Sequence, residues 1–196
     1  MQAQTLQAIK LNAPDKKRGS AMMQTFSDRH SDREFSRQEL DLQDLSDLLW
    51  AANGVNRKDG KRTAPSAMNR QEIDVYVVRA DGAYLYDAPS HSLKPVAGGD
   101  HRAAVAGQQD YVKTAPASLV MVINLDKLGD PNAGHTKLMG AVDAGIVSQN
   151  INLFCAAVGL STVPRASMDQ AELRKVLKLS DTQLPIMNNP VGYPKK

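Results

Sequence analysis

The stretch TKLMGAVDAGIVSQNINLFCAAV, residues 136–158, decides the fold of this chain. Its apolar residues occur around most of the circumference of a helix, and Gly159 follows where a left-handed residue ends a helix. The residues that carry the pattern are Val142, Ile146, Val147, Ile151 and Phe154. A helix that is apolar on several faces is buried in the middle of a structure. We therefore predict a long central helix with more apolar surface than one small domain covers.

Strand patterns precede this helix. Residues 118–125, SLVMVINL, form a nearly continuous apolar run, which is typical of a central strand buried on both faces. Residues 73–79 alternate and are rich in β-branched and aromatic residues, and the dipeptide Asp81-Gly82 then leads into Tyr84-Leu85-Tyr86. This order predicts a β-hairpin.

The rest of the chain mixes helix and strand patterns. From Leu42 to Ala52, leucine and alanine recur at helical spacing, and Gly54 stands where a left-handed residue would end that helix. The other assignments are a short helix at 102–112, an amphipathic helix at 169–177, a last strand at 184–191 interrupted by Pro190, and an irregular stretch at 89–99. Without regular β-α-β alternation this predicts the α+β class. We expect one domain over residues 25–196, preceded by an N-terminal arm over 1–24.

Composition excludes several function classes. With 196 residues, 42% of them hydrophobic, the chain can bury one full-sized core. The net charge of +3 comes from cations spread along the chain, and only 5% of residues are aromatic, so an anionic ligand is favoured and a nucleic-acid-binding surface is not. A single cysteine, Cys155, excludes an internal disulfide and a multi-cysteine metal site, so no metal is expected.

No membrane contact is expected either. No segment reaches the roughly 20 consecutive apolar residues of a membrane span, and the N-terminus lacks a positive start followed by an apolar run. The chain as given is predicted to be soluble. A cytoplasmic location is favoured, and a periplasmic or secreted one stays open if a signal peptide was removed.

A set of basic and small polar residues could hold a phosphate. Arg29, Ser31 and Arg33 are spaced two apart, so in an extended segment they project to one side, where two guanidinium groups and a hydroxyl could bind an anion. From spacing alone a solvated charged loop is the better interpretation, because charge clusters are usually at the surface.

The order of several short motifs changes that balance. The chain reads RHSDREF at 29–35, LLWAANG at 48–54, PSAMNRQ at 65–71, GLSTVP at 159–164 after Gln149-Asn150, and VGYP at 191–194. Together, over residues 29–196, these segments resemble the nitroreductase family, in particular its SagB/nitroreductase-like branch. The resemblance implies a central, mostly antiparallel sheet flanked by helices in an intertwined homodimer, with FMN bound non-covalently at the interface.

The resemblance also assigns cofactor contacts, residue by residue. It places Arg29, His30, Ser31 and Arg33 on the ribityl phosphate and the polar edge of the flavin, and Ser66, Ala67 and Asn69 on the ring from the partner subunit. It places Arg165, Ala166 and Ser167 on the turn along the ring, and Lys195 and Lys196 on the phosphate. Ala166-Ser167 stands where family members often have Glu-Gly, so the resemblance does not fix the substrate range.

The implied function is an FMN-dependent oxidoreductase that transfers electrons from NADH or NADPH to a small electron-poor acceptor, a nitroaromatic or a quinone, in two steps. The flavin carries this chemistry, so no catalytic residue of the protein is expected. The alternatives are a substrate-specific flavin dehydrogenase related to thiazoline/oxazoline oxidases, and a flavin-binding protein without turnover. Open questions are the physiological acceptor, the preferred nicotinamide donor, the terminal lysine that contacts phosphate, and any role of His101 or Cys155 in turnover.

Overall fold

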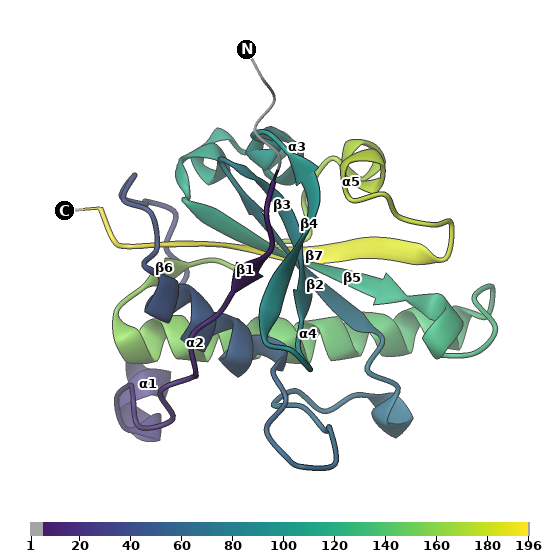
Figure 1. Ribbon diagram of the computed structural model, residues 1–196, viewed down its shortest axis with the longest axis horizontal. Coiled ribbons are helices and arrows are strands. Elements are labelled where there is room, and N and C mark those ends of the chain that lie inside the picture. The colour runs from purple at the N-terminus through teal and green to yellow at the C-terminus, as the bar shows by residue number, and fades with distance from the viewer. Residues whose placement is uncertain (1–5, 196) are drawn as a thin grey trace.

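Seven antiparallel strands form the centre of the structure, a computed structural model that describes residues 6–195 (Figure 1). Their order across the sheet is β1-β4-β3-β2-β5-β7-β6. The bounds are β1 Ile9–Lys10, β2 Ile73–Arg79, β3 Gly82–Asp87, β4 Ser92–Gly98, β5 Ala117–Asn124, β6 Ser161–Thr162 and β7 Gln183–Gly192. The predicted hairpin is β2 and β3, and the predicted α+β class with an antiparallel sheet is confirmed.

Helices cover both faces of this sheet (Figure 1). The α-helices are α1 Met22–Asp28, α2 Leu42–Asn53, α3 Arg102–Ala106, α4 Gly134–Val158 and α5 Gln170–Val176. Three 3-10 turns lie between them, η1 Ala67–Asn69, η2 Asp110–Thr114 and η3 Leu125–Lys127. Helices α2 and α4 pack in the larger hydrophobic cluster, whereas α3 and α5 pack in a second cluster on the opposite face.

Strand β5 shows why the central run is apolar throughout. Leu119 and Met121 belong to the cluster under α2 and α4, and Val120 and Val122 belong to the cluster under α3 and α5. Successive side chains of a strand point to opposite faces, so a strand covered on both faces has no position for a solvated residue. The predicted central buried strand is therefore confirmed.

Helix α4 runs along the sheet as predicted and ends at Gly159, whose φ of 77° is left-handed. A Cβ atom on Gly140 would lie 2.5 Å from a methyl group of Ile123, so glycine lets the helix approach β5 closely. No segment is expected from the sequence to be long and apolar enough to span a membrane, but α4 meets this criterion by length and composition. Core helices pass the same test, and α4 carries the buried Ser148, which donates to Asn189 of the sheet.

Two of the sequence predictions near the first hairpin and first long helix are wrong. Gly54 has φ −78° and ψ 161°, so it is extended; glycine is needed because a Cβ there would lie 2.6 Å from the ring of Trp50. The stretch 89–99 is not irregular, since it contains β4 between β1 and β3. The sequence pattern of this strand is weak because Lys94 and Pro95 are exposed. The strand is stabilised by pairing with β1 on one side and β3 on the other.

Two more boundaries differ from the prediction. The helix expected at 102–112 stops at Ala106 because Gly107 turns the chain at φ 55°, ψ −118°, and η2 follows. Strand β7 continues through Pro190, which pairs with Ser118 and accepts a hydrogen bond on its carbonyl from Thr162. Proline removes only an N–H, so the strand is not interrupted there.

The N-terminal arm is partly structured within the described residues. Ile9 and Lys10 pair with β4, and Leu11 is buried in the larger cluster. Helix α1 spans the expected boundary between residues 24 and 25 and packs on α4. The arm therefore adds an edge strand to the sheet.

Candidate functional site

Residues 29–37 lie beside the end of the chain. The backbone N–H of Asp32 donates to the carbonyl of Thr162 at 2.9 Å, and that of Ser36 donates to the carbonyl of Tyr193 at 2.8 Å. Phe35 and Pro194 form an antiparallel bridge. The polar segment that the sequence places near the N-terminus is thereby fixed against the C-terminal tail.

The Gly-Tyr-Pro sequence of the tail has a structural reason. A Cβ atom on Gly192 would lie 2.6 Å from Pro116 and 3.4 Å from the ring of Phe35. The hydroxyl of Tyr193 donates to Asp44 at 2.5 Å, and burial together with this bond raises the pKa of Tyr193. Both contacts hold the tail so that Lys195 reaches the segment 29–37.

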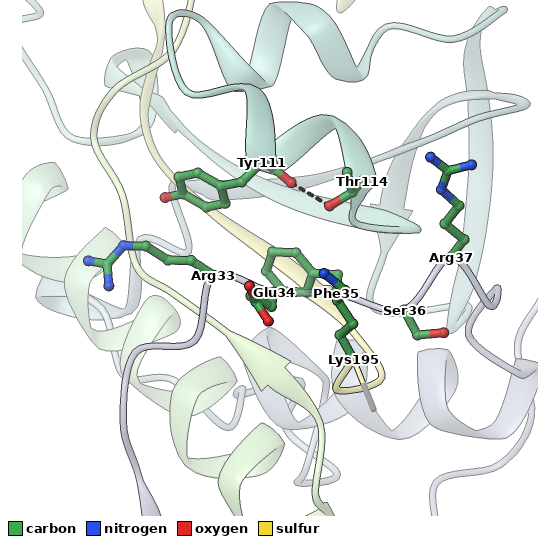
Figure 2. Close-up of a pocket in the computed structure, with 8 residues that line it drawn as sticks. All are labelled: Arg33, Glu34, Phe35, Ser36, Arg37, Tyr111, Thr114 and Lys195. Atoms are coloured by element: carbon green, nitrogen blue, oxygen red, sulfur yellow. Dashed lines mark hydrogen bonds between the residues drawn. The ribbon is translucent and has the colours of Figure 1, made fainter.

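A cationic hollow of about 520 Å³ opens between these segments and η2 (Figure 2). Its lining residues are Arg33, Glu34, Phe35, Ser36, Arg37, Tyr111, Thr114 and Lys195. Figure 2 shows the guanidinium groups of Arg33 and Arg37 on opposite sides of Phe35, with Lys195 between them. Within residues 6–195 none of these three cations has an ion pair. Three cations against one carboxylate suit an anionic ligand.

The predicted residues 29–33 do not all face this hollow. Arg33 lines it together with Lys195. His30 instead lines a second hollow of about 300 Å³ near Gly159, and its Nδ1–H donates to the carbonyl of Asp28. Arg29 is half-buried and Ser31 is exposed, and neither side chain has a polar partner in the described part of the chain. Both remain available to a ligand.

Asp32 explains the conformation of this segment. Its carboxylate accepts from the Ser161 hydroxyl at 2.5 Å and from the backbone N–H of Glu34 at 3.1 Å. Partial burial by itself raises the pKa of Asp32, but these two hydrogen bonds outweigh it and hold the pKa below its usual value. Asp32 thus anchors the segment to β6 and leaves its neighbours exposed.

The resemblance places Arg165 on the turn along the ring, and the structure shows where its side chain points. It is buried, and its guanidinium group donates to the Gln109 side chain at 2.8 Å, the Asn188 side chain at 2.7 Å, and the carbonyls of Val105 and Ala106 at 3.2 and 3.0 Å. Four of the five guanidinium N–H groups therefore donate to acceptors inside the protein. The side chain ties α3 to β7 and is not free to bind a phosphate.

The turn after Arg165 is rigid but exposes backbone donors. The backbone N–H of Arg165 donates to the carbonyl of Asn188, and the Asn188 side chain donates to the carbonyl of Ser167 at 3.1 Å. Ala166 and Ser167 are exposed, and no acceptor for their N–H groups is found among residues 6–195. Two fixed, unpaired N–H groups can donate to a ligand that becomes negatively charged.

The loop of residues 65–71 is the most strained part of the described chain. Met68, Asn69 and Gln71 have φ between 50° and 54°, a left-handed conformation that costs on the order of 1 kcal/mol or more for each non-glycine residue. The loop is held by the backbone N–H of Ala67, which donates to Asp143, and by that of Gln71, which donates to the Ser66 hydroxyl. Asn69 is exposed at its tip.

This loop and the segment 29–33 lie toward opposite ends of α4 (Figure 1). Ala67 contacts Asp143, whereas the hollow beside His30 is lined by Ala156, thirteen positions further along the helix. A helix rises 1.5 Å per residue, so these contact points are about 20 Å apart. A single chain therefore does not bring Ser66, Ala67 and Asn69 to the predicted phosphate ligands. Lys196 lies outside the described residues.

Large apolar side chains are exposed near the loop and on α1. They are Met22, Met23, Phe26, Met68, Leu138, Met139 and Val142, with Leu42 on α2. Exposed apolar clusters of this kind usually mark a protein interface. By contrast, Cys155 is fully buried, which raises the pKa of its thiol, and the Nε2–H of His101 donates to the carbonyl of Gly98 before α3.

The structure thus combines an antiparallel sheet beside one long central helix with the cations Arg33, Arg37 and Lys195 around one hollow, and the family match below identifies this arrangement as that of an oxidoreductase. The chain belongs to the nitroreductase family, whose family model matches residues 26–193.

Its relatives agree with this assignment. A nitroreductase-like protein of Methanocaldococcus jannaschii is 30% identical over 177 residues, which cover 84% of this chain and 86% of that protein. The crystal structure of a nitroreductase-like protein from Ralstonia eutropha JMP134 superposes with a TM-score of 0.91 at 36% identity, covering 100% of this chain and 92% of the other. An FMN reductase [NAD(P)H] of Bacillus subtilis is 24% identical over 187 residues, covering 88% of this chain and 66% of that protein.

Proposed function

We propose that this protein is an FMN-dependent oxidoreductase that takes electrons from NADH or NADPH and passes them to a small electron-poor acceptor, a quinone or a nitroaromatic. The observation that carries the proposal is the set of unpaired cations, Arg29, Arg33 and Lys195, around a chain segment fixed against the C-terminal tail. The name of the Bacillus subtilis relative supports both FMN and the nicotinamide donor.

The residues fit the cofactor in charge and in hydrogen-bonding capacity. Arg29, Arg33 and Lys195 would hold the phosphate, and the N–H groups of Ala166 and Ser167 would donate to the polar edge of the ring. When bound, FMN would supply the redox chemistry by accepting a hydride from the donor and releasing electrons to the acceptor. The protein then needs to orient the ring and stabilise negative charge, and no nucleophile is required.

A homodimer completes the proposed site. The Ser66–Asn69 loop lies about 20 Å along α4 from the segment beside His30, so within one chain it cannot close on the same ring. A second copy related by a two-fold axis could present its own loop. The exposed Met68, Leu138 and Val142 supply apolar surface for that contact.

The purified protein is expected to be yellow and to release FMN, not FAD or riboflavin, when it is denatured. The measurement is the absorption spectrum followed by chromatography of the released flavin. Steady-state consumption of NADH or NADPH with menadione then separates an enzyme from a flavin-binding protein without turnover. A colourless protein that cannot be reconstituted with FMN would refute the proposal.

Val142→Glu is expected to convert the dimer to a monomer and to abolish tight FMN binding. The substitution places a charge on an apolar surface of α4 that we assign to the interface, where an unpaired buried charge is costly. Light scattering at micromolar concentration measures the mass. Ala103→Glu, on the exposed face of α3, is the control and should leave the dimer unchanged. A wild-type monomer that still binds FMN contradicts the dimer model.

A further inference from the structure

A fully buried carboxyl group lies at the end of the strained loop. Glu72 is 0% exposed and immediately precedes β2. Neither of its carboxyl oxygens has a hydrogen-bond donor among the residues that the structure describes. Its neighbour is the carboxyl group of Asp143 on α4, which lies within hydrogen-bonding reach. Because Glu72 is enclosed by its own chain, a partner subunit cannot supply the missing donor.

Two neighbouring carboxyl groups can bond to each other only by sharing a proton. A carboxylate only accepts hydrogen bonds, whereas a carboxylic acid donates one. Two ionised carboxylates in contact repel each other, so one of the pair retains its proton to a higher pH. Burial, followed by the contact with Asp143, raises the pKa of Glu72 to about 7.

The nearby cations, Lys127 and Arg62, do not neutralise the Glu72–Asp143 pair in place of the shared proton. Lys127 acts weakly on Glu72, but its ammonium group already donates to Asp74 and to the carbonyl of Gln71, each at 3.2 Å. Arg62 interacts with Asp74 and donates to the Gln71 side chain at 3.0 Å. Both cations therefore bind the Gln71 end of the loop, and neither donates a hydrogen bond to Glu72 or Asp143 among the described residues.

Asp143 connects the pair to the loop. One of its carboxyl oxygens accepts from the backbone N–H of Ala67 at 2.7 Å, directly before Met68 and Asn69, which have positive φ. A strained backbone persists only where its surroundings hold it. The bond from Ala67 is therefore one of the contacts that keep Ser66 and Asn69 in position.

We propose that Glu72 and Asp143 form a proton-sharing pair that positions the 65–71 loop, and that loss of the shared proton releases this loop and weakens flavin binding. Glu72 and Asp143 act here as positioning residues, through Ala67. The pair holds the loop through the contacts described above, and its effect on flavin binding rests on the proposed function.

The direction of the pH effect follows from proton linkage. Between the ordinary pKa of a glutamate and about pH 7, the folded state holds a proton on Glu72 that the unfolded chain has lost. Stability therefore falls as pH rises through this window, and the loss is complete above it. In the folded protein, ionisation of Glu72 places a second negative charge beside Asp143 and competes with its bond to Ala67.

The test compares conservative amide variants at about pH 5.5 and about pH 8.5, on either side of the Glu72 titration. In Glu72→Gln an amide donates to Asp143 at every pH, and in Asp143→Asn an amide can donate to Glu72 and accept from Ala67. Glu172→Gln, on α5, is the matched control because, among residues 6–195, the Glu172 carboxylate is bonded only to Lys175. Amide hydrogen exchange of Ala67 in flavin-free protein reports on the loop, and the FMN dissociation constant reports on the site.

The Kd for FMN of the wild type, divided by that of Glu72→Gln, is expected to be near one at the lower pH and to rise at least about tenfold at the higher. The FMN phosphate titrates near pH 6 in both proteins, so its effect cancels in this ratio. Exchange at Ala67 should accelerate in the wild type by a similar factor relative to the variant. Asp143→Asn should lack the additional pH dependence, and Glu172→Gln should behave as the wild type.

A ratio of dissociation constants and of Ala67 exchange rates that does not change with pH overturns the inference. The same holds if Glu72→Gln lowers stability and affinity equally at both pH values, which is the result expected of a merely structural residue. If one variant fails to fold, the other amide variant gives the same comparison. Absence of FMN binding at every pH refutes the proposed function instead, and Ala67 exchange then still decides whether the pair holds the loop.

Discussion

Replacing Arg29 by alanine is expected to weaken FMN binding by about tenfold to a hundredfold and to leave riboflavin binding within about threefold of the wild type. The reason is that a charge-assisted hydrogen bond to a phosphate contributes about 1.5 to 3 kcal/mol, and riboflavin has no phosphate. Arg29 is half-buried without a polar side-chain partner in the described chain, so its removal breaks no internal bond. Titration of the flavin-free protein with both ligands measures the two affinities.

The neighbouring cations sharpen this test. Arg33→Ala should have an effect of the same kind, because Arg33 faces the hollow that Lys195 also lines. Removal of Lys195 and Lys196 should have a smaller effect, since a terminal lysine is a flexible point charge. Lys175→Ala, an exposed cation on α5, is the control. Equal weakening of FMN and riboflavin by Arg29→Ala would show that Arg29 contacts the ring or supports the fold.

Arg165→Met is expected to lower the free energy of unfolding by about 3 kcal/mol or more, because unsatisfied buried acceptors cost about 1 to 3 kcal/mol each. The substitution keeps most of the side-chain volume but leaves the Asn188 side-chain oxygen and the Val105 carbonyl without their donor, whereas the Ala106 carbonyl keeps the backbone N–H of Gln109. Urea denaturation monitored by circular dichroism gives the change, provided that the slope with urea concentration is unchanged.

Arg165→Lys should give an intermediate loss, because one ammonium group cannot reach all acceptors of a planar guanidinium. The ratio of FMN to riboflavin affinity should stay at the wild-type value in both variants, since the Arg165 side chain points into the protein. A selective loss of FMN affinity would instead show that the Arg165 guanidinium group contributes to phosphate binding. Lys175→Met controls for loss of a charge at the surface.

Local pattern was sufficient for much of the fold. The apolar circumference of residues 136–158 predicts α4, and the apolar run at 118–125 predicts β5. Strand β5 is apolar because both of its faces are buried, whereas α4 is apolar toward the sheet and also on an exposed surface that includes Leu138 and Val142. The Asp81-Gly82 turn predicts the β2–β3 hairpin, because a tight turn is encoded by the residues that form it. The order of the family motifs predicts Arg33 and Lys195 near one another, although 162 positions separate them.

The remaining features depend on residues that are distant in sequence. Strand β4 exists because β1 and β3 pair with it, and Gly54 is glycine because Trp50 lies against it. The local sequence around Arg165 does not indicate burial, and only the packing of α3 near β7 shows that its guanidinium group is enclosed.

The sequence by itself determined the class of fold, the central helix and the family, since these follow from hydrophobic periodicity and motif order. Only the tertiary structure decided which cations are free and which carboxyl groups meet. Glu72 and Asp143 are 71 positions apart, and nothing in either local sequence indicates a shared proton. Solvation, and with it the charge of a side chain, is set by whatever the folded chain brings within a few ångströms of it.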